Sequence, residues 1–289
     1  GKVIKNFIPS TTTSSEIAEL MVGKKVLPTI KSKSRAKNII LNINNLSIDS
    51  RTPFGTNLKN ISLKVRQGEI LGIGGVAGSG QDELLLTLTG ETKVKKNTLF
   101  YKNKDIGNLN PQERREIGFL TAPEERLGHA AAPEMTLMEN CLITAKKSRK
   151  LMVRGWINFT KTADFANDII KKFDVRAGDN KSLAKTLSGG NLQKFLIGRE
   201  LSQDPEVIIV NQPTWGVDAA AAQFIRQALL NLVSHGAAAI IISQDLDELI
   251  EISDRFTALV NGSMSTPRVT TELTVSEIGL MLSTEDAPR

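Results

Sequence analysis

The chain has 289 residues, 40% hydrophobic and 24% charged, which excludes a disordered polypeptide and allows one large or two small globular domains. Basic residues exceed acidic ones by 37 − 31 = +6, a mild excess that points only weakly to nucleic acid or an anionic membrane. We attribute much of it to a solvated linker around Lys31–Lys37. Cys141 is the only cysteine, which excludes an intrachain disulfide and fits a reducing compartment. The sequence contains no run of about eighteen apolar residues, so no transmembrane helix is predicted.

Residues 1–37 are expected to form a tail. It contains a short predicted helix with a serine N-cap and a glycine stop at Gly23. Two β-rich runs follow, NIILNINNLSI at 38–48 and NISLKVRQGE at 60–69, each bounded by turn residues. They predict strands of a small sheet.

A glycine loop follows the buried strand EILGIGGV and precedes the helix QDELLLTLTG. Its spacing, Gly75-x-x-Gly78-x-Gly80, matches the phosphate-binding pattern G-x-x-G-x-G-K-[ST], and strand, loop and helix come in the order that the motif requires. Two positions depart from the pattern. Gln81 stands where the lysine belongs, and Asp82 stands where the magnesium-binding hydroxyl belongs.

The second half of the chain alternates strand and helix patterns. Between about 124 and 200 the periodicity is helical, and the apolar runs beyond it are typical of parallel strands buried on both faces. Such alternation predicts an α/β fold with a helical insertion. The further strands are predicted at 97–103, 115–122, 206–214 and 237–243, and a helix ending in a glycine stop at 219–236.

Five stretches in chain order resemble the ATPase domain of ABC transporters. They correspond to the Walker A, signature, Walker B, D-loop and switch segments, at 75–82, 187–191, 207–214, 216–218 and 240–245. More narrowly, PEERLGHAAAPEMTLMEN and LSGGNLQKFLIGRE resemble the second half of tandem ATPases that serve simple-sugar and nucleoside importers. The segment SSEIAELMVGKKV looks like the linker that leaves the first ATPase domain of such a protein.

The resemblance implies a P-loop NTPase fold of the ABC type. It implies a mixed central sheet, an antiparallel β subdomain and a helical insertion that carries the signature motif. The expected organisation is a linker at 1–37, the ATPase domain at 38–262 with its helical part at about 124–200, and a C-terminal tail at 263–289.

The signature motif opens a helix. Its residues are Leu187, Ser188, Gly189, Gly190 and Asn191. A helix start offers unpaired N–H groups and the positive end of the helix dipole, and both suit a phosphate. In the family this motif binds the γ-phosphate of ATP that is held by the facing domain. The alternative is an ordinary serine-capped helix with a glycine turn.

The chain's own phosphate loop is expected to bind ATP weakly or not at all. Backbone donors remain available to cradle a phosphate, at Gly75, Gly78, Ser79 and Gly80. Gln81, however, lacks the lysine charge, and Asp82 adds a carboxylate. Two unit charges ~4 Å apart interact by about 4 kcal/mol at an effective dielectric of 20, so losing an attraction and gaining a repulsion costs several kcal/mol.

The ends of two later strands lack catalytic groups as well. Asn211 replaces the aspartate that secures Mg²⁺, Gln212 the glutamate that acts on the attacking water, and Gln244 the switch histidine. A missing general base lowers the rate by ~10²–10⁴. The alternative is that these side chains are ordinary polar groups at the end of a sheet. Asp218 resembles the D-loop aspartate that works across the dimer interface, and it also suits the N-cap of the following helix.

Other residues leave alternatives open. Phe54 either stacks on adenine or is buried as a hydrophobic plug. Glu124 to Arg126 occupy the segment that links the nucleotide site to the permease in the family, and an exposed charged loop is the alternative. His129 and His235 have no spacing for metal ligation, so no metal site is expected on these residues.

These observations predict the catalytically impaired half of an asymmetric ATPase pair. ATP and Mg²⁺ are expected in a composite site with the first ATPase domain of the same protein. The further partners expected are two transmembrane permease subunits and, indirectly, an extracytoplasmic binding lipoprotein, but no nucleic acid. The expected location is the cytoplasmic face of a bacterial cell membrane. The alternatives are an independently active ATPase and a regulatory ABC protein without a transport role.

Overall fold

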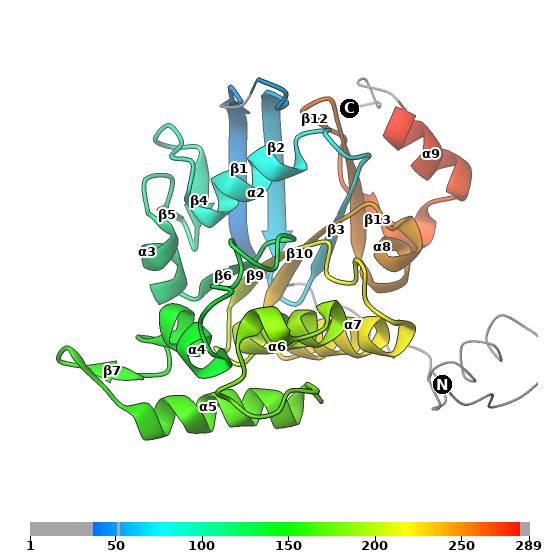
Figure 1. Cartoon of the computed structure of the whole chain (residues 1–289). Helices are drawn as coiled ribbons and strands as arrows, with labels where there is room; N and C mark the ends of the chain where they lie inside the picture. Colours follow the sequence, from blue (N-terminus) through cyan, green and yellow to red (C-terminus); the bar gives the residue numbers. More distant parts are fainter. Residues whose placement is uncertain (1–36, 51–52, 284–289) are drawn as a thin grey trace, which may run out of the picture.

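The computed structural model describes residues 37–50 and 53–283 (Figure 1). The predicted helix ending at Gly23, and the rest of the tail up to residue 36, lie outside the described residues.

A seven-stranded sheet forms the centre of the molecule, with the order β12-β11-β3-β10-β9-β6, and β13 pairs with β11. The inner pairs are parallel, whereas β12 and β13 run antiparallel to β11, so the sheet is mixed as predicted. Strands β3, β9 and β10 are buried along their whole length, which explains their continuous apolar sequences. The strands are β3 Ile70–Gly74, β6 Phe119–Ala122, β9 Val207–Asn211, β10 Ala238–Ser243, β11 Arg255–Val260, β12 Ser263–Met264 and β13 Arg268–Val269.

A four-stranded antiparallel sheet, with the order β2-β1-β4-β5, forms a second layer. Helix α2, Gln81–Thr89, shares one hydrophobic core with this sheet and with one face of the central sheet. Leu84 and Leu88 of α2 are fully buried there. The strands are β1 Ile39–Ile48, β2 Leu58–Arg66, β4 Leu99–Tyr101 and β5 Lys104–Asp105.

The helical part covers the other face of the central sheet and shares a second core with it (Figure 1). Helix α4 packs on α5, α5 on α6, and α6 on α7. A small hairpin connects α4 to α5 along the chain and was not predicted. Its strands are β7 Met152–Val153 and β8 Trp156–Ile157. The helices are α3 Pro111–Glu116, α4 Leu137–Ala145, α5 Phe159–Lys172, η2 Ala184–Thr186, α6 Gly189–Leu201, α7 Ala219–Ser234 and α8 Leu246–Ile252.

The residues after 262 continue the fold, which differs from the expected C-terminal tail. Strands β12 and β13 extend the central sheet, and η3 Thr270–Glu272 leads into α9, Val275–Ser283. Ile278 and Met281 of α9 are buried in the core beside β11. Helix α9 has only nine residues, too few to show a clear helical periodicity of apolar side chains in the sequence.

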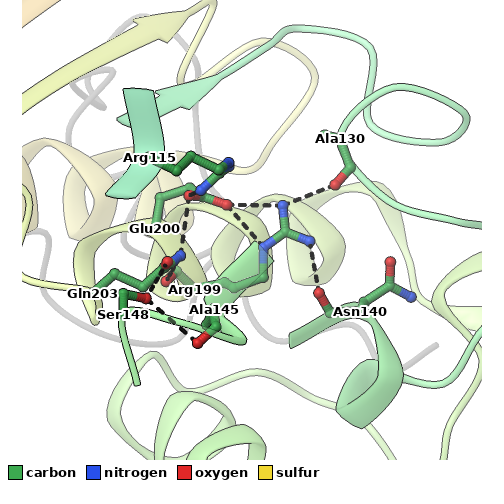
Figure 2. A network of polar contacts seen from close by, with 8 residues as sticks. All are labelled: Arg115, Ala130, Asn140, Ala145, Ser148, Arg199, Glu200 and Gln203. Atoms are coloured by element: carbon green, nitrogen blue, oxygen red, sulfur yellow. Dashed lines mark hydrogen bonds and ion pairs between the residues drawn. The ribbon is translucent and has the colours of Figure 1, made fainter. Parts of the chain in front are cut away.

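A buried ion network fixes α6 to the surrounding elements (Figure 2). The Glu200 carboxylate accepts hydrogen bonds from Arg115 of α3 at 2.6 Å and from Arg199 Nε at 2.9 Å. Arg199 also donates to the carbonyl of Ala130 at 2.8 Å. Burial alone raises the pKa of Glu200, but the two guanidinium groups outweigh it and hold that pKa below its ordinary value. The carboxylate therefore stabilises the fold at neutral pH, and this contribution is lost as the pH falls through the depressed pKa.

Replacing Arg199 by Met should destabilise the chain by about 3–5 kcal/mol, because it leaves the Glu200 carboxylate buried with one counter-charge fewer. The free energy of unfolding, measured in urea at neutral pH, tests this. Arg268→Ala removes an arginine from a half-exposed pair with Glu277 and should cost far less, because water screens an exposed pair. Equal losses in the two variants would contradict the assigned role of the network.

Candidate nucleotide site

The glycine loop joins β3 to α2 in the conformation that the motif requires. Gly78 and Gly80 have φ values of 81° and 106°, in the left-handed region that favours glycine. A Cβ on Gly80 would come within 2.9 Å of Leu58 Cδ2, so the close approach to β2 also favours glycine. The strand, loop and helix of the phosphate-binding pattern are therefore all present.

Gln81 closes this loop with its own side chain. Its Nε2 donates to the carbonyl of Val76 at 2.8 Å, and its Oε1 accepts from the backbone N–H of Ser79 at 3.0 Å. The side chain is buried against Gly75, where a Cβ would come within 2.8 Å of Gln81 Nε2. One of the N–H groups that would otherwise face a phosphate is thus satisfied inside the loop.

Carboxylates surround the mouth of the loop. Burial and then the neighbouring Glu83 raise the pKa of the Asp82 carboxyl group. Burial and then Asp82 raise the pKa of Glu124, against the opposing effect of Arg126. Asp82 and Glu124 are therefore close enough to repel each other when both are ionised. A triphosphate at this position would add further negative charge to the same place.

The Gln212 side chain at the end of β9 contacts residues at the end of the neighbouring strand β10. Asn211 and Gln212 are both buried. Gln212 Oε1 lies 3.4 Å from the hydroxyl of Ser243 and 3.4 Å from the backbone N–H of Gln244. The structure therefore brings all three predicted positions to one edge of the central sheet. An amide has no basic site that can accept a proton from water at neutral pH. None of these three residues can therefore act as a general base.

The signature residues form an exposed tip on a buried helix. From Leu192 to Leu201 every residue of α6 is buried, whereas Ser188 and Gly189 are exposed. Ser188 occupies the N-cap position, but its side chain makes no capping hydrogen bond to the helix. Its hydroxyl instead accepts from Asn191 Nδ2 at 2.9 Å. Ser188 therefore takes the N-cap position of the predicted alternative but without its hydroxyl bond, and the first N–H groups of α6 are not covered by this side chain.

Asp218 lies beside this tip. Its Oδ1 accepts from the backbone N–H of Ala221 at 2.9 Å, so the predicted N-cap of α7 is confirmed. Its Oδ2 lies 3.7 Å from the position that a Cβ on Gly190 would take. The signature and D-loop segments therefore come together on one surface, while the role of Asp218 across an interface stays a prediction.

Arg126 joins three of the motif segments, a role that the sequence did not reveal. Its Nε donates to Gln193 Oε1 at 3.0 Å, and its Nη2 donates to the carbonyl of Trp215. Gln193 Nε2 in turn donates to the carbonyl of Pro213 at 3.0 Å. The segment after β6 is thus tied to the signature helix and to the chain that leads into the D-loop. A contact between Glu124–Arg126 and a permease remains untested.

The remaining candidates take part in ordinary contacts. Phe54 is fully exposed, so the hydrophobic plug is wrong, and stacking on adenine stays a prediction. His129 pairs with Glu91 at 2.9 Å, and His235 caps α7. Burial raises the pKa of the Cys141 thiol to about 12, as for an inert thiol. Within residues 37–50 and 53–283, no cluster of metal-ligating side chains occurs, and no helix is long and apolar enough to cross a bilayer.

Solved structures share this fold. A nucleotide-free ATP-binding cassette from an ABC transporter superposes with a TM-score of 0.65 and 27% sequence identity, over 86% of this chain and 96% of the cassette. A dimeric cassette in a post-hydrolysis state, bound to ADP and phosphate, gives a TM-score of 0.67 at 21% identity, over 80% of this chain and 99% of that one. The second likeness shows the fold alone.

Sequence relatives agree with the structural match. A nucleoside import ATP-binding protein of Lactococcus lactis subsp. cremoris, NupA, is 35% identical over 98% of this chain and 56% of its own length. A guanosine import ATP-binding protein of Bacillus subtilis, NupO, is 32% identical over the same shares, and a ribose import ATP-binding protein of Clostridium tetani, RbsA, is 33% identical over 92% and 51%. The chain thus spans about half the length of these curated relatives. The family model described as ABC transporter matches residues 58–215, and the chain belongs to that family, with the fold of its ATP-binding cassettes.

Proposed function

We propose that this chain is the degenerate, second nucleotide-binding domain of a tandem ATPase that drives import of a sugar or a nucleoside. The relatives' names supply the transport class, and their double length leaves room for a first ATPase domain. In this proposal the chain donates its signature tip and D-loop to the ATP site of that first domain. It hydrolyses no ATP of its own.

The observation that carries the proposal is a contrast between the two halves of the site. The phosphate loop is closed by Gln81 and followed directly by Asp82, which adds a carboxylate where the motif has a hydroxyl. The signature tip is exposed and not capped by Ser188. Loss of function by random drift would not be expected to spare the surface that serves a partner while removing the groups that serve the chain itself.

The mechanism follows from where the intact groups lie. The partner domain's phosphate loop would hold ATP and Mg²⁺, and the amides at Gly189 and Gly190 would meet the γ-phosphate with the positive end of the α6 dipole. Asp218 would lie at the same interface. ATP would close the two domains and hydrolysis would release them, which would drive alternating access in two permease subunits at the cytoplasmic face of the membrane. A binding lipoprotein would deliver the solute.

Turnover of the purified 289-residue chain tests the proposal. The chain alone should release no phosphate from Mg-ATP above background, because Gln212 cannot act as a general base and Gln81 and Asp82 disfavour the triphosphate. The protein that contains both ATPase domains should hydrolyse ATP at one site per molecule. If the isolated chain matched the turnover of the complete protein, the independently active alternative would replace this proposal.

A further inference from the structure

The β7–β8 hairpin exposes large apolar side chains that take no part in the candidate nucleotide site. Trp156 is 83% exposed, Phe159 64% and Val153 56%. Single exposed apolar residues are normal on a protein surface, but these three lie within seven residues of one another. Figure 1 shows the hairpin projecting beyond α4 and α5, away from the central sheet.

The hairpin is a fixed structure and not a loose loop. Val153 pairs with Trp156 across a two-residue turn, Arg154 and Gly155, with φ values of 51° and 86°. Both positive values fit the tight turn that matches the twist of a hairpin. Leu151 anchors its base, since its side chain is buried and its carbonyl accepts from the N–H of Asn158 at 2.9 Å. Because paired residues share a face of the ladder, the side chains of Val153 and Trp156 lie on the same side.

The charged side chains of the hairpin segment itself are all basic, whereas the acidic residues Glu116, Asp204 and Asp164 border it. Residues 146–163 contain six basic and no acidic side chains. Lys147 pairs with Glu116, and Arg149 pairs with Asp204. Among the residues that the structure describes, no ion pair is seen for the others. The six are Lys146, Lys147, Arg149, Lys150, Arg154 and Lys161.

We propose that the β7–β8 hairpin rests on the surface of an anionic lipid bilayer, with Trp156 at the level of the headgroups. Tryptophan favours this level because its ring is apolar and its N–H is polar. Lys150 and Arg154 would meet the negative surface potential while their aliphatic stems lie along the apolar boundary. A fluid lipid surface offers no pocket of fixed shape, and a projecting tip of this kind can bind without one.

Flotation with vesicles measures the proposed contact. The 289-residue chain should bind vesicles that contain equal amounts of phosphatidylcholine and phosphatidylglycerol, and should not bind phosphatidylcholine alone. Lys150→Gln with Arg154→Gln should weaken this binding roughly twenty-five-fold, since each cation near an anionic surface contributes roughly five-fold. Trp156→Ala should weaken it roughly ten-fold. Added salt should weaken binding of the unaltered chain.

A matched control removes the same charge elsewhere. Lys95→Gln with Lys96→Gln acts on an exposed loop before β4 and should change vesicle binding far less than the hairpin variants do. Equal effects of the two charge pairs would overturn the proposal, because the attraction would then belong to the whole chain.

Fluorescence locates the contact, because the chain has two tryptophans. In Trp215→Phe the emission comes from Trp156 alone and should shift to the blue on anionic vesicles. In Trp156→Phe the emission comes from Trp215 and should not shift. No shift in the first variant would overturn the proposal. A hairpin variant that keeps vesicle binding but no longer attaches to a purified permease in detergent would assign the hairpin to a protein partner instead.

Discussion

Gln81→Lys combined with Asp82→Ser should give this chain a measurable affinity for Mg-ATP. The change restores a cation and a hydroxyl, opens the Gln81 contacts with Val76 and Ser79, and removes the carboxylate that repels Glu124. Full electrostatic effects of about 4 kcal/mol each at ~4 Å are reduced at this partly exposed position, so we expect a gain of roughly 10²-fold or more. Isothermal titration of the purified chain measures it. Hydrolysis should stay absent, because Asn211 and Gln212 are unchanged.

A control separates charge from loop closure. Gln81→Met removes the side-chain amide and thus opens the loop, but it adds no charge. Loss of the two hydrogen bonds should cost about 1 kcal/mol of stability each, and ATP affinity should rise little. If Gln81→Met alone gave the full gain, closure of the loop, and not the missing charge, would be what prevents binding. If the double variant gave no gain, the loop would not be a former nucleotide site.

Ser188→Arg should abolish ATP hydrolysis by the complete two-domain protein, although this domain hydrolyses nothing. The long cation would occupy the space in front of Gly189 and Gly190, where the proposal places the partner's γ-phosphate. Removing a single preorganised donor from a reacting oxyanion costs ~10²–10³ in rate, and a side chain that prevents closure should cost more. Steady-state phosphate release measures the loss. Mg-ATP should still bind to the phosphate loop of the first domain.

The structure supplies the control for this variant. Because the Ser188 hydroxyl does not cap α6, Ser188→Ala should leave the melting temperature near its original value, and it adds no bulk in front of Gly189 and Gly190. Ser188→Arg should likewise leave the melting temperature of the 289-residue chain near its original value, since the position is exposed. Full turnover of the Ser188→Arg protein would show that the tip meets no partner phosphate.

The sequence predicted β3, β6, β9 and β10 of the central sheet because these strands are apolar runs, but it did not predict β11, β12 or β13. It predicted the glycine loop because backbone conformation there depends on glycine. It did not predict the hydrogen bonds of Gln81, since an amide side chain carries no signal for the carbonyl it will select. Arg126 was equally hidden: its partners Gln193 and Trp215 lie 67 and 89 residues away along the chain. The spacing of residues within a segment says nothing about such long-range contacts.

Short elements were missed for a related reason. The hairpin strands have two residues each, too few for any periodicity, although the Arg154–Gly155 pair between apolar runs is a turn signal. Helix α9 is stabilised by packing Ile278 and Met281 beside β11, and this contact is invisible without the sheet. Tertiary packing, and not local propensity, decides whether elements of this length form.

The missing lysine charge at Gln81 and the added carboxylate of Asp82 would set the stoichiometry of the proposed pair. With one usable pocket, the pair would take up a single triphosphate per transport cycle, and its saturation curve would be hyperbolic with a Hill coefficient of one. Coordination between successive cycles would then have to come from the permease and the arriving solute, since no second nucleotide is there to report on the first.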